Sequence, residues 1–427
     1  DIETMNRRDL EALQLERLKH IVDYCYNNVP FYHERLRQAG VTGDKIKTLS
    51  DVQYIPCTTK DDIRDNYPFQ MLAQPMKKIV RIHASSGTTG KPTVGVYTRQ
   101  DIENWSDQVA RVAVGGGATE GDIIQIAFGY GLFTGGLGAH AGGEAVGCSV
   151  IPTSSGNTKR QIQMMKDLGT DILACTPSYA LLIADTAIEM GYDPAKDFKV
   201  SGVILGAEPA SEGMRDEIRQ KLGVQYCDVY GLSEVMGPGV AMECSASHGL
   251  HVAEDHFYPE IVDPDTLKPV PDGTYGELVF TTLTRECCPL VRYRTRDVTR
   301  IINEECSCGR THRKIDRIIG RTDDMMIIRG VNVFPSQIEQ VITGFPEIAT
   351  QYQIVLSNNG PLDRIELQVE PVLDFPFDEI RKLEDLKHRL HAELKSNLQI
   401  SVDIRIVEPK TIERSEGKAK RIIDNRN

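Results

Sequence analysis

The sequence predicts an α/β protein with a large N-terminal domain and a small C-terminal α+β domain. Within residues 80–229, short β-rich runs alternate with longer amphipathic segments, which is typical of a parallel sheet flanked by helices. Between residues 258 and 302, two further β-rich runs follow each other without a helix, which indicates a smaller β-subdomain. A compact mixture of β-rich and helical segments comes after Asp323. The length of 427 residues fits two or three domains.

The first 79 residues contain a helical segment that we assign to the large domain. Apolar positions recur among charged ones, at Leu10, Leu13, Ile21, Val22 and Cys25. This spacing predicts an amphipathic helix, and Pro30 lies just past its expected end.

The expected strands of the parallel sheet are five apolar runs: Ile123–Phe128, Cys148–Pro152, Ile172–Cys175, Val203–Leu205 and Tyr226–Val229. A turn is predicted at Pro271-Asp272-Gly273, with strands after it at Glu277–Leu283 and Leu290–Arg294. We therefore expect residues 80–323 to form the core of the large domain, with an antiparallel or barrel-like β-subdomain.

The expected C-terminal domain, residues 324–427, combines both kinds of element. β-rich segments lie at Met325–Arg329, Tyr352–Leu356, Ile365–Val369 and Val402–Val407, and helical ones at Pro335–Ile342 and Phe377–Leu398. The polar, glycine-containing stretch Glu413–Lys420 predicts a mobile loop.

Composition argues against several kinds of partner. The net charge of −12 speaks against nucleic acid and anionic membranes, which bind basic surfaces. No run approaches the roughly 18 apolar residues of a membrane span, and the charged start at Asp1 lacks the apolar stretch of a secretion signal. Ten cysteines spread over this length predict mostly reduced and buried thiols. We expect a cytoplasmic protein.

A polar loop follows the apolar run Val80–Ile82. It concentrates hydroxyls, two glycines and one lysine in Ser85, Ser86, Gly87, Thr88, Thr89, Gly90 and Lys91. Backbone N–H groups, hydroxyls and an ammonium in such a loop suit phosphate oxygens. A Walker A loop is excluded, because it needs four residues between its first glycine and the Gly-Lys pair, and only two stand here. Pro92 and the apolar residues after it predict that the loop links two strands; a solvated Ser/Thr/Gly turn is the alternative.

The segment Ser85–Thr93 resembles the phosphate-binding motif of the adenylate-forming ligases, and most closely that of the phenylacetate-CoA ligase family. Five later segments resemble the other motifs of this family in the same order: Gly206-Ala207-Glu208-Pro209, Tyr230-Gly231-Leu232-Ser233-Glu234, Tyr293–Asp297, Gly320–Asp324 with Arg329–Pro335, and Arg414–Lys420. Six ordered motifs make chance agreement implausible.

The resemblance implies a nucleotide site on the large domain. Tyr230, preceding Gly231, would lie beside the adenine, Ser233 would meet the α-phosphate, and Glu234 would hold Mg²⁺. A carboxylate beside a triphosphate needs a hard cation between them, which agrees with that role. The alternative is the start of a surface helix at Ser233.

Two more segments complete the implied nucleotide site. The turn of Ala207, Glu208 and Pro209 would contact the adenine, and a plain strand-to-helix turn is the alternative. Asp297 would accept hydrogen bonds from the ribose hydroxyls with its two carboxylate oxygens, and a structural Arg–Asp pair competes with this interpretation.

The resemblance also implies a mobile C-terminal domain. Asp323 would be the hinge and Arg321 would contact phosphate. Lys418, selected over Lys420 by alignment on Gly-Lys, would bridge the substrate carboxylate and the α-phosphate; a solvated tail is the alternative.

The implied activity is ATP-dependent ligation of a carboxylic acid to coenzyme A through an acyl-adenylate. Two alternatives stay open: transfer of the acyl group to a carrier protein or an amine, and an inactive nucleotide-binding regulator. Retention of Glu234, Asp297 and Lys418 speaks against the regulator. A kinase is excluded, because neither Walker A nor the protein-kinase glycine loop is present.

An acyl pocket is expected near the strand that ends at Phe128. Tyr130 and Phe133, with Met236 and Pro238, would line a slot for a flat ring, so the predicted substrate is an aryl acid such as phenylacetate. Ordinary core packing of these side chains is the alternative. The resemblance further implies a homodimer.

Cysteines and histidines away from these motifs suggest a metal site. Cys306-Ser307-Cys308-Gly309 forms a predicted turn, and Cys244, His248 and His251 lie on another predicted loop. We predict a structural Zn²⁺ bound by Cys244, His251, Cys306 and Cys308, with His248 or His312 as substitutes. Unused reduced thiols are the alternative, since Cys-x-Cys is tighter than the usual spacing.

Overall fold

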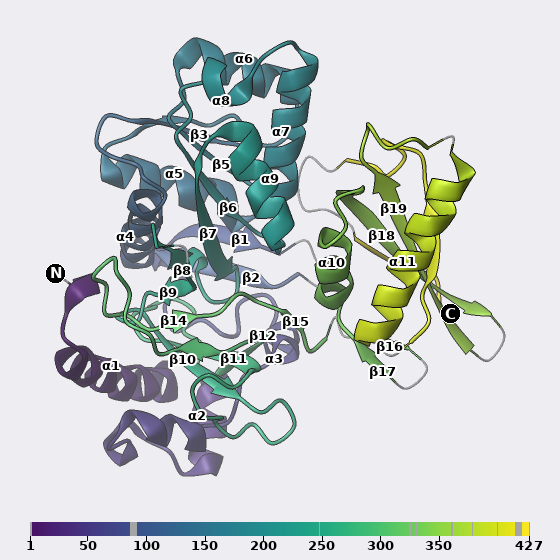
Figure 1. Cartoon of the computed structure of the whole chain (residues 1–427). Helices are drawn as coiled ribbons and strands as arrows, with labels where there is room; N and C mark the ends of the chain where they lie inside the picture. The colour runs from purple at the N-terminus through teal and green to yellow at the C-terminus, as the bar shows by residue number, and fades with distance from the viewer. Residues whose placement is uncertain are drawn as a thin grey trace.

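The computed structural model describes residues 2–85, 92–246, 248–323, 326–328, 331–359, 362–377, 379–398, 400–414 and 421–426. A large body and a smaller C-terminal body lie beside each other (Figure 1). Helix α10 (Pro335–Thr343) of the small body contacts α9 (Glu212–Leu222) of the large one.

The chain begins with helices on the lower edge of the large body as Figure 1 shows it. The predicted amphipathic helix is confirmed as α1 (Arg7–Asn28), which the Asn6 side chain caps by accepting from the Asp9 backbone N–H. Pro30 opens α2 (Pro30–Ala39), where its missing N–H costs nothing. Single 3₁₀ turns and the short helix α3 follow, at Gly43–Lys45, Leu49–Tyr54, Lys60–Asp65 (α3) and Met76–Lys78.

The central sheet has nine strands in the order β13-β14-β9-β8-β7-β6-β5-β3-β4. Five are parallel and confirm the prediction: β3 (Ile123–Ile126), β4 (Ser149–Ile151), β5 (Ile172–Cys175), β6 (Gly202–Gly206) and β7 (Gln225–Leu232). Four are antiparallel: β8 (Gly237–Glu243), β9 (Leu250–Val252), β13 (Ile301–Ile302) and β14 (Lys314–Ile315). The predicted loop containing His251 is therefore wrong at that residue, which lies within β9.

Helices cover both faces of the parallel strands. On one face α4 (Arg99–Gly115) and α5 (Thr134–Val146) pack on Ile172 and Ala174. On the other, α6 (Thr158–Leu168), α7 (Pro177–Glu189) and α9 pack on Leu173 and Cys175, and α8 spans Pro194–Asp197. Because side chains alternate along a strand, neighbouring residues of β5 serve opposite layers. Every position of β5 and β6 is buried, which explains their continuous apolar sequences.

Two smaller sheets complete the large body. The polar loop joins the antiparallel strands β1 (Ile79–Ala84) and β2 (Val94–Thr98), as predicted. An antiparallel sheet contains β10 (Phe257–Val262), β11 (Gly276–Thr282), β12 (Tyr293–Thr299) and β15 (Gly320–Arg321). The strand predicted at Leu290–Arg294 starts later, at Tyr293, because Arg292 has a left-handed backbone with φ of 45°.

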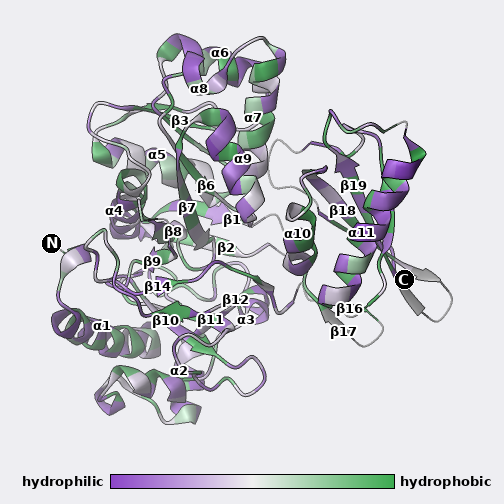
Figure 2. Cartoon of the chain, in the orientation of Figure 1, coloured by the Kyte–Doolittle hydropathy of each residue, from purple (hydrophilic) through white to green (hydrophobic). Residues whose placement is uncertain are grey.

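The small body is a four-stranded sheet backed by two helices. The sheet order is β20-β19-β18-β21, with bounds Asp403–Ile406, Leu362–Pro371, Ile348–Asn359 and Ile422–Asp424. Helix α11 (Ile380–Leu398) buries Leu386, Leu390, Leu394 and Leu398, one per turn, and its visible outer face is largely hydrophilic (Figure 2). Strands β16 (Met326–Ile328) and β17 (Val331–Val333) form a separate hairpin.

Across the described ranges, no helix has both the length and the apolar character that crossing a membrane requires.

Candidate active site

The base of the predicted phosphate loop is closed by hydrogen bonds between its two ends. The Ser85 N–H donates to the Thr93 carbonyl at 2.9 Å, and the Thr93 N–H donates to Ser85 Oγ at 3.0 Å. Thr93 Oγ1 also donates to Glu234 Oε1 at 3.2 Å. Six predicted members of the loop lie outside the described residues: Ser86, Gly87, Thr88, Thr89, Gly90 and Lys91. The described ends nevertheless bring the loop and Glu234 together.

Glu234 lies in the turn that joins β7 to β8. The alternative of a helix start at Ser233 is wrong, because the Val235 N–H closes a turn on the Leu232 carbonyl and an antiparallel strand follows. The Glu234 side chain is 9% exposed and pairs with Lys60, whose Nζ lies 3.0 Å from Oε1. The carboxylate is thus neutralised by a cation from the N-terminal helical segment.

Lys60 is a site residue that the sequence interpretation missed. It occupies the first position of α3, directly after the N-cap Thr59. The backbone just before Lys60 is held in place by two hydrogen bonds. The Thr58 N–H donates to Arg292 O, and Thr58 O accepts from the Arg294 N–H, both at 2.9 Å. Lys60 and Glu234 are 174 positions apart in the sequence and meet only in the folded chain, so no local sequence pattern predicts their contact.

Asp297, which is buried, forms a cluster with the partly exposed Tyr230 and Arg321 at the predicted ribose position. Tyr230 Oη donates to Asp297 Oδ2 at 2.5 Å, and Arg321 Nη1 donates to Asp297 Oδ1 at 2.9 Å. Burial raises the pKa of Asp297, although the Arg321 guanidinium opposes the shift. Arg321 also binds Asp323 through Nε and Nη2, at 2.9 and 3.0 Å. The structure therefore joins three predicted residues and the predicted hinge.

The predicted adenine turn ends strand β6. Gly206 lies so close to β7 that an added Cβ would meet Val229 O at 2.5 Å. Ala207 follows with φ of 71°, a left-handed conformation that is uncommon for alanine. The Glu208 carboxylate accepts from the Ser178 N–H at 2.6 Å, at the start of α7. The carboxyl edge of a parallel sheet, where this turn lies, is the usual place for ligands in α/β proteins.

The predicted acyl-pocket residues occupy different environments. Phe133 is 53% exposed directly before α5, and Tyr130 Oη lies 3.1 Å from His140 Nδ1. The next residue, Thr134, lies with its hydroxyl 3.2 Å from Ser233 Oγ, which brings this segment to the predicted α-phosphate residue. Met236 has no exposed surface and belongs to the core, while the Pro238 carbonyl accepts from Trp105 Nε1 at 2.9 Å. Met236 thus fits the alternative of core packing.

The predicted catalytic lysine, Lys418, lies outside the described residues, but both ends of its loop are anchored on the small body. Arg414 pairs with the buried Glu370 of β19 at 2.8 Å. The Arg421 guanidinium lies 4.5 Å from the ring centre of Tyr352 in β18. A contact between the two bodies comes from Lys410 Nζ, 2.5 Å from Glu189 Oε1 of α7.

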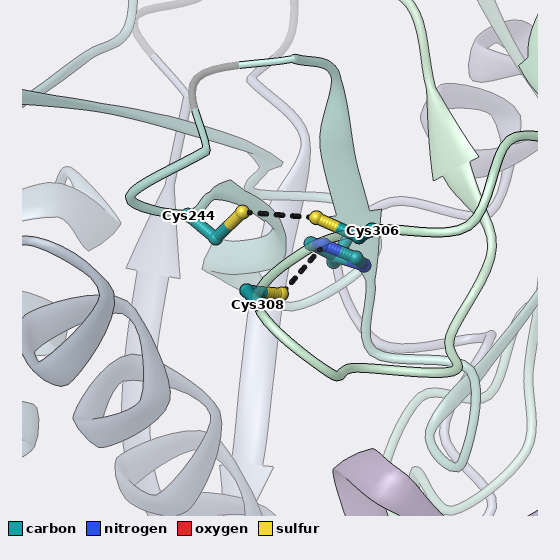
Figure 3. A group of neighbouring side chains, drawn as sticks. Cys244, Cys306 and Cys308 are labelled. Carbon is teal, nitrogen blue, oxygen red and sulfur yellow. Dashed lines mark hydrogen bonds between the residues drawn. The ribbon is translucent and has the colours of Figure 1, made fainter.

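Cys244, His251, Cys306 and Cys308 meet in one group, as predicted (Figure 3). One donor atom from each lies within 4.8 Å of all the others. His248 and His312 are not members: His248 Nε2 pairs with Glu304 at 3.1 Å, and both ring nitrogens of His312 lie 3.1 Å from backbone carbonyls. None of the ten cysteines is in a disulfide, and eight of them are buried, as predicted.

Comparison with known proteins matches the whole chain. The AMP-binding enzyme family matches residues 11–283, and the AMP-binding enzyme C-terminal domain matches residues 330–426. The phenylacetate-coenzyme A ligase of Escherichia coli K12 is 49% identical over 428 residues, covering 100% of this chain and 97% of that protein. That of Thermus thermophilus is 46% identical over 441 residues, covering 100% of this chain and 99% of that protein.

Solved structures extend the match to the arrangement of the two bodies. A 2-hydroxyisobutyryl-CoA ligase in the postadenylation state, in complex with 2-HIB-AMP, has a TM-score of 0.93 at 28% identity, covering 99% of this chain and 91% of that one. The same enzyme with 2-HIB-AMP and CoA in the thioesterification state has a TM-score of 0.74 at 29% identity, covering 100% and 91%. The present arrangement thus resembles the postadenylation state.

These matches confirm the predicted fold and the predicted acid–CoA ligation, and they do not favour a carrier-protein acceptor, an amine acceptor or an inactive regulator. The chain is an ATP-dependent acid–thiol ligase that works through an acyl-adenylate, and it belongs to the phenylacetate-coenzyme A ligase family of AMP-binding enzymes.

Proposed function

We propose that this enzyme joins an aryl acid, phenylacetate or a close analogue, to coenzyme A. The observation that carries the proposal is the cluster around Glu234. Glu234 contacts Thr93, at the end of the predicted phosphate loop, and Lys60. The neighbouring Ser233 contacts Thr134, which follows the predicted acyl-pocket residue Phe133. Four relatives named phenylacetate-coenzyme A ligases support the choice of acid. The half-exposed Phe133 ring beside Thr134 offers a face for an aromatic substrate.

In the proposed first half-reaction, a carboxylate oxygen of the acid attacks the α-phosphorus of ATP and pyrophosphate leaves. Two anions must meet, so the enzyme needs positive charge and N–H donors around the phosphates. We assign the triphosphate to the Ser85–Thr93 loop and the α-phosphate to Ser233 and Lys418. Tyr230 and the turn of Ala207, Glu208 and Pro209 would hold the adenine, with Gly231 giving close approach to β8; Asp297 would hold the ribose.

Mg²⁺ belongs to the same proposal, and the described residues fit it. The Glu234 carboxylate and the Thr93 hydroxyl are oxygen donors, which this ion prefers, and they lie 3.2 Å apart. When bound there, Mg²⁺ would neutralise charge on the phosphates. Lys60 would have to leave the Glu234 oxygen that it contacts.

In the proposed second half-reaction, the thiolate of CoA attacks the acyl carbon, a C–S bond forms, and AMP leaves with the electrons of the C–O bond. The hinge at Asp323 would turn the small domain between the steps, withdrawing Lys418. Arg321 would change partners as the hinge turns, because it already binds Asp323 and Asp297 together.

Pyrophosphate release tests the proposal directly. The purified enzyme, given ATP, Mg²⁺ and a panel of aryl, hydroxy and fatty acids, with and without CoA, should release pyrophosphate only with an acid and fastest with phenylacetate. Omission of CoA should limit release to about one equivalent per site. Release without any acid would contradict the mechanism, and a preference for fatty acids would contradict the aryl substrate.

We propose domain boundaries after residues 79 and 323, a homodimer, and a cytoplasmic location, in line with the absence of a membrane-crossing helix in the described ranges. Light scattering of the eluted protein checks the dimer, and a mass of one chain would contradict it.

A further inference from the structure

We infer that Cys244, His251, Cys306 and Cys308 bind one tetrahedral Zn²⁺, and that this ion fastens the start of the chain to the edge of the nine-stranded sheet. The ion has no part in ligation, so the inference stands apart from the proposed substrate.

The donor set and its dimensions fit this metal. Three thiols and one imidazole are the ligands that Zn²⁺ prefers in closed structural sites. Bond lengths of about 2.3 Å to sulfur and 2.0–2.1 Å to nitrogen imply donor separations of about 3.5–3.8 Å in a tetrahedron. The structure has 3.5 Å between Cys244 Sγ and Cys306 Sγ, and 3.5 Å between Cys308 Sγ and His251 Nε2. A disulfide between the first two is excluded, since it requires about 2.05 Å.

The imidazole of His251 is held in the orientation that a metal ligand needs. Its Nδ1 lies 3.0 Å from the His312 carbonyl, which can only accept a hydrogen bond, so Nδ1 carries the proton. The lone pair is therefore on Nε2, the atom that lies 3.5 Å from Cys308 Sγ. Such a second contact is what fixes the ring of a metal-binding histidine.

The pairing of the strands places the four residues close together even without a bound ion. Cys244 directly follows β8, and His251 lies in the next strand, β9. His251 pairs across to Lys314 of β14, and Cys306 and Cys308 lie in the connection from β13 to β14. That connection turns tightly, with the Gly309 N–H donating to Cys306 O at 3.0 Å and Gly309 at φ of 82°.

The residues after Cys308 hold the start of the chain. Arg310 Nε lies 2.7 Å from Glu3 Oε1, and the Thr311 N–H donates to Glu3 O at 2.9 Å. Thr311 Oγ1 donates to Met5 O, and His312 Nε2 lies 3.1 Å from Ile2 O. An ion that fixes Cys306 and Cys308 therefore also fixes residues 2–5, which lead into α1.

Glu254 links the β13–β14 connection to α1, so loss of order in that connection is expected to weaken the packing of α1. This fully buried carboxylate accepts from the Arg313 N–H at 2.6 Å and pairs with Arg7 of α1. Gln14 of α1 donates to Glu254 O at 2.9 Å. Among the described contacts of the four proposed ligands, none involves Glu234, Asp297 or Arg321.

Metal content of the full-length protein tests the ion. Elemental analysis after exhaustive dialysis should find about one zinc per chain, and a mercurial reagent should release it as thiols react. Cys306→Ser and Cys308→Ser should each lower zinc at least tenfold, whereas the matched control Cys148→Ser, on the far edge of the sheet before β4, should keep it. Wild-type protein without zinc, or ligand variants with full zinc, would overturn the inference.

Hydrogen exchange tests the fastening in the wild-type chain, so it does not depend on variants that fold. Removal of zinc by a chelator should raise exchange in residues 2–28 and 303–312, and added Zn²⁺, but not Mg²⁺, should restore protection. Exchange in β5 and β6 should stay unchanged. Unchanged protection of residues 2–28 on zinc removal would overturn the fastening. Neither experiment assays ligation, so failure here leaves the proposed function untouched.

Discussion

The Cys/His group and the nucleotide site differ in how their parts are assembled. The four side chains of the Cys/His group come from the end of β8, from β9 and from the β13–β14 connection of one sheet, and their donor atoms lie within 4.8 Å of one another. The proposed nucleotide site draws on the β1–β2 hairpin, the β7–β8 turn, strands β12 and β15 and, through the proposed role of Lys418, the small body. Its charged side chains contact each other: Glu234 pairs with Lys60, and Asp297 with Arg321.

The difference reflects what each site has to do. A structural site binds one ion once, so a rigid edge with converged donors is sufficient. A catalytic site must take up and release charged substrates, and a buried carboxylate without a counter-charge is costly. Glu234 and Asp297 are each paired with a cation, Lys60 and Arg321, which Mg²⁺ and the ribose would replace in the proposed mechanism. We therefore expect ligands to replace the ion pairs at the nucleotide site, and a bound ion to stay in place at the Cys/His group.

The largest effect is expected for Lys418→Ala. Loss of the cation at the α-phosphate should lower acid-dependent pyrophosphate release by at least about 10²-fold, the size of losing one preorganised donor. Thioester formation from supplied acyl-adenylate and CoA should survive. Lys420→Ala is the matched control in the same loop and should keep adenylation. Equal loss of both half-reactions in Lys418→Ala would contradict a role confined to the first.

Glu234→Gln should slow pyrophosphate release by about 10²-fold, because a neutral amide binds the cation poorly. The Mg²⁺ concentration needed for half-maximal rate should rise at the same time. Glu393→Gln, a change of the same kind on the exposed part of α11, serves as control. An unchanged Mg²⁺ requirement would show that Glu234 does not hold the ion.

Asp297→Asn should raise the KM for ATP by about 10-fold or more, since charged hydrogen bonds contribute about 1.5–3 kcal/mol. The kcat should change less. Wild-type enzyme should discriminate against 2′- or 3′-deoxy-ATP, and the variant should lose that discrimination. Retained discrimination would leave the Asp297–Arg321 pair as purely structural.

Lys60→Met should lower the Mg²⁺ concentration at half-maximal rate by a few-fold, because the ammonium and the metal compete for Glu234 Oε1. Lys196→Met, which removes an exposed lysine of α8, should have no effect. A higher KM for ATP with an unchanged Mg²⁺ requirement would instead indicate that Lys60 binds the phosphates of ATP.

The smallest effect on chemistry is expected from zinc removal. Below the melting temperature, kcat/KM should change by less than about tenfold, because the group contacts none of the described nucleotide-site residues. The melting temperature should fall by several degrees, since an ion that binds only the folded chain stabilises it. Loss of adenylation in folded, zinc-free enzyme would contradict a purely structural role for the Cys/His group.

Sequence alone predicts those parts that local chemistry determines. Strands β5 and β6 are continuous apolar runs because both faces are covered, and α11 has a leucine stripe. The Cys/His group is predictable because cysteine and histidine are scarce, so a few of them on nearby segments stand out. Strand β9 was missed because it is only three residues long, and β21 because a short strand depends on its partner β18.

Long-range pairing is what sequence spacing cannot reveal. Lys60 reaches Glu234 only because Thr58 is hydrogen-bonded beside β12. Met236 was assigned to the acyl slot from its position near Glu234, yet its side chain turns into the core. The identity of Arg321 as the partner of Asp297, rather than Arg294 or Arg296, likewise follows from the pairing of β12 with β15.

One guanidinium links the proposed ribose site to the proposed hinge. Arg321 holds Asp297 through Nη1 while Nε and Nη2 hold Asp323, so a backbone rotation at Asp323 must strain or break that two-point grip. If Asp323 is the hinge, Arg321 has to let go of one of its two carboxylates before the small domain can turn. Arg321 is therefore expected to resist that rotation, and Arg321→Ala should make it faster.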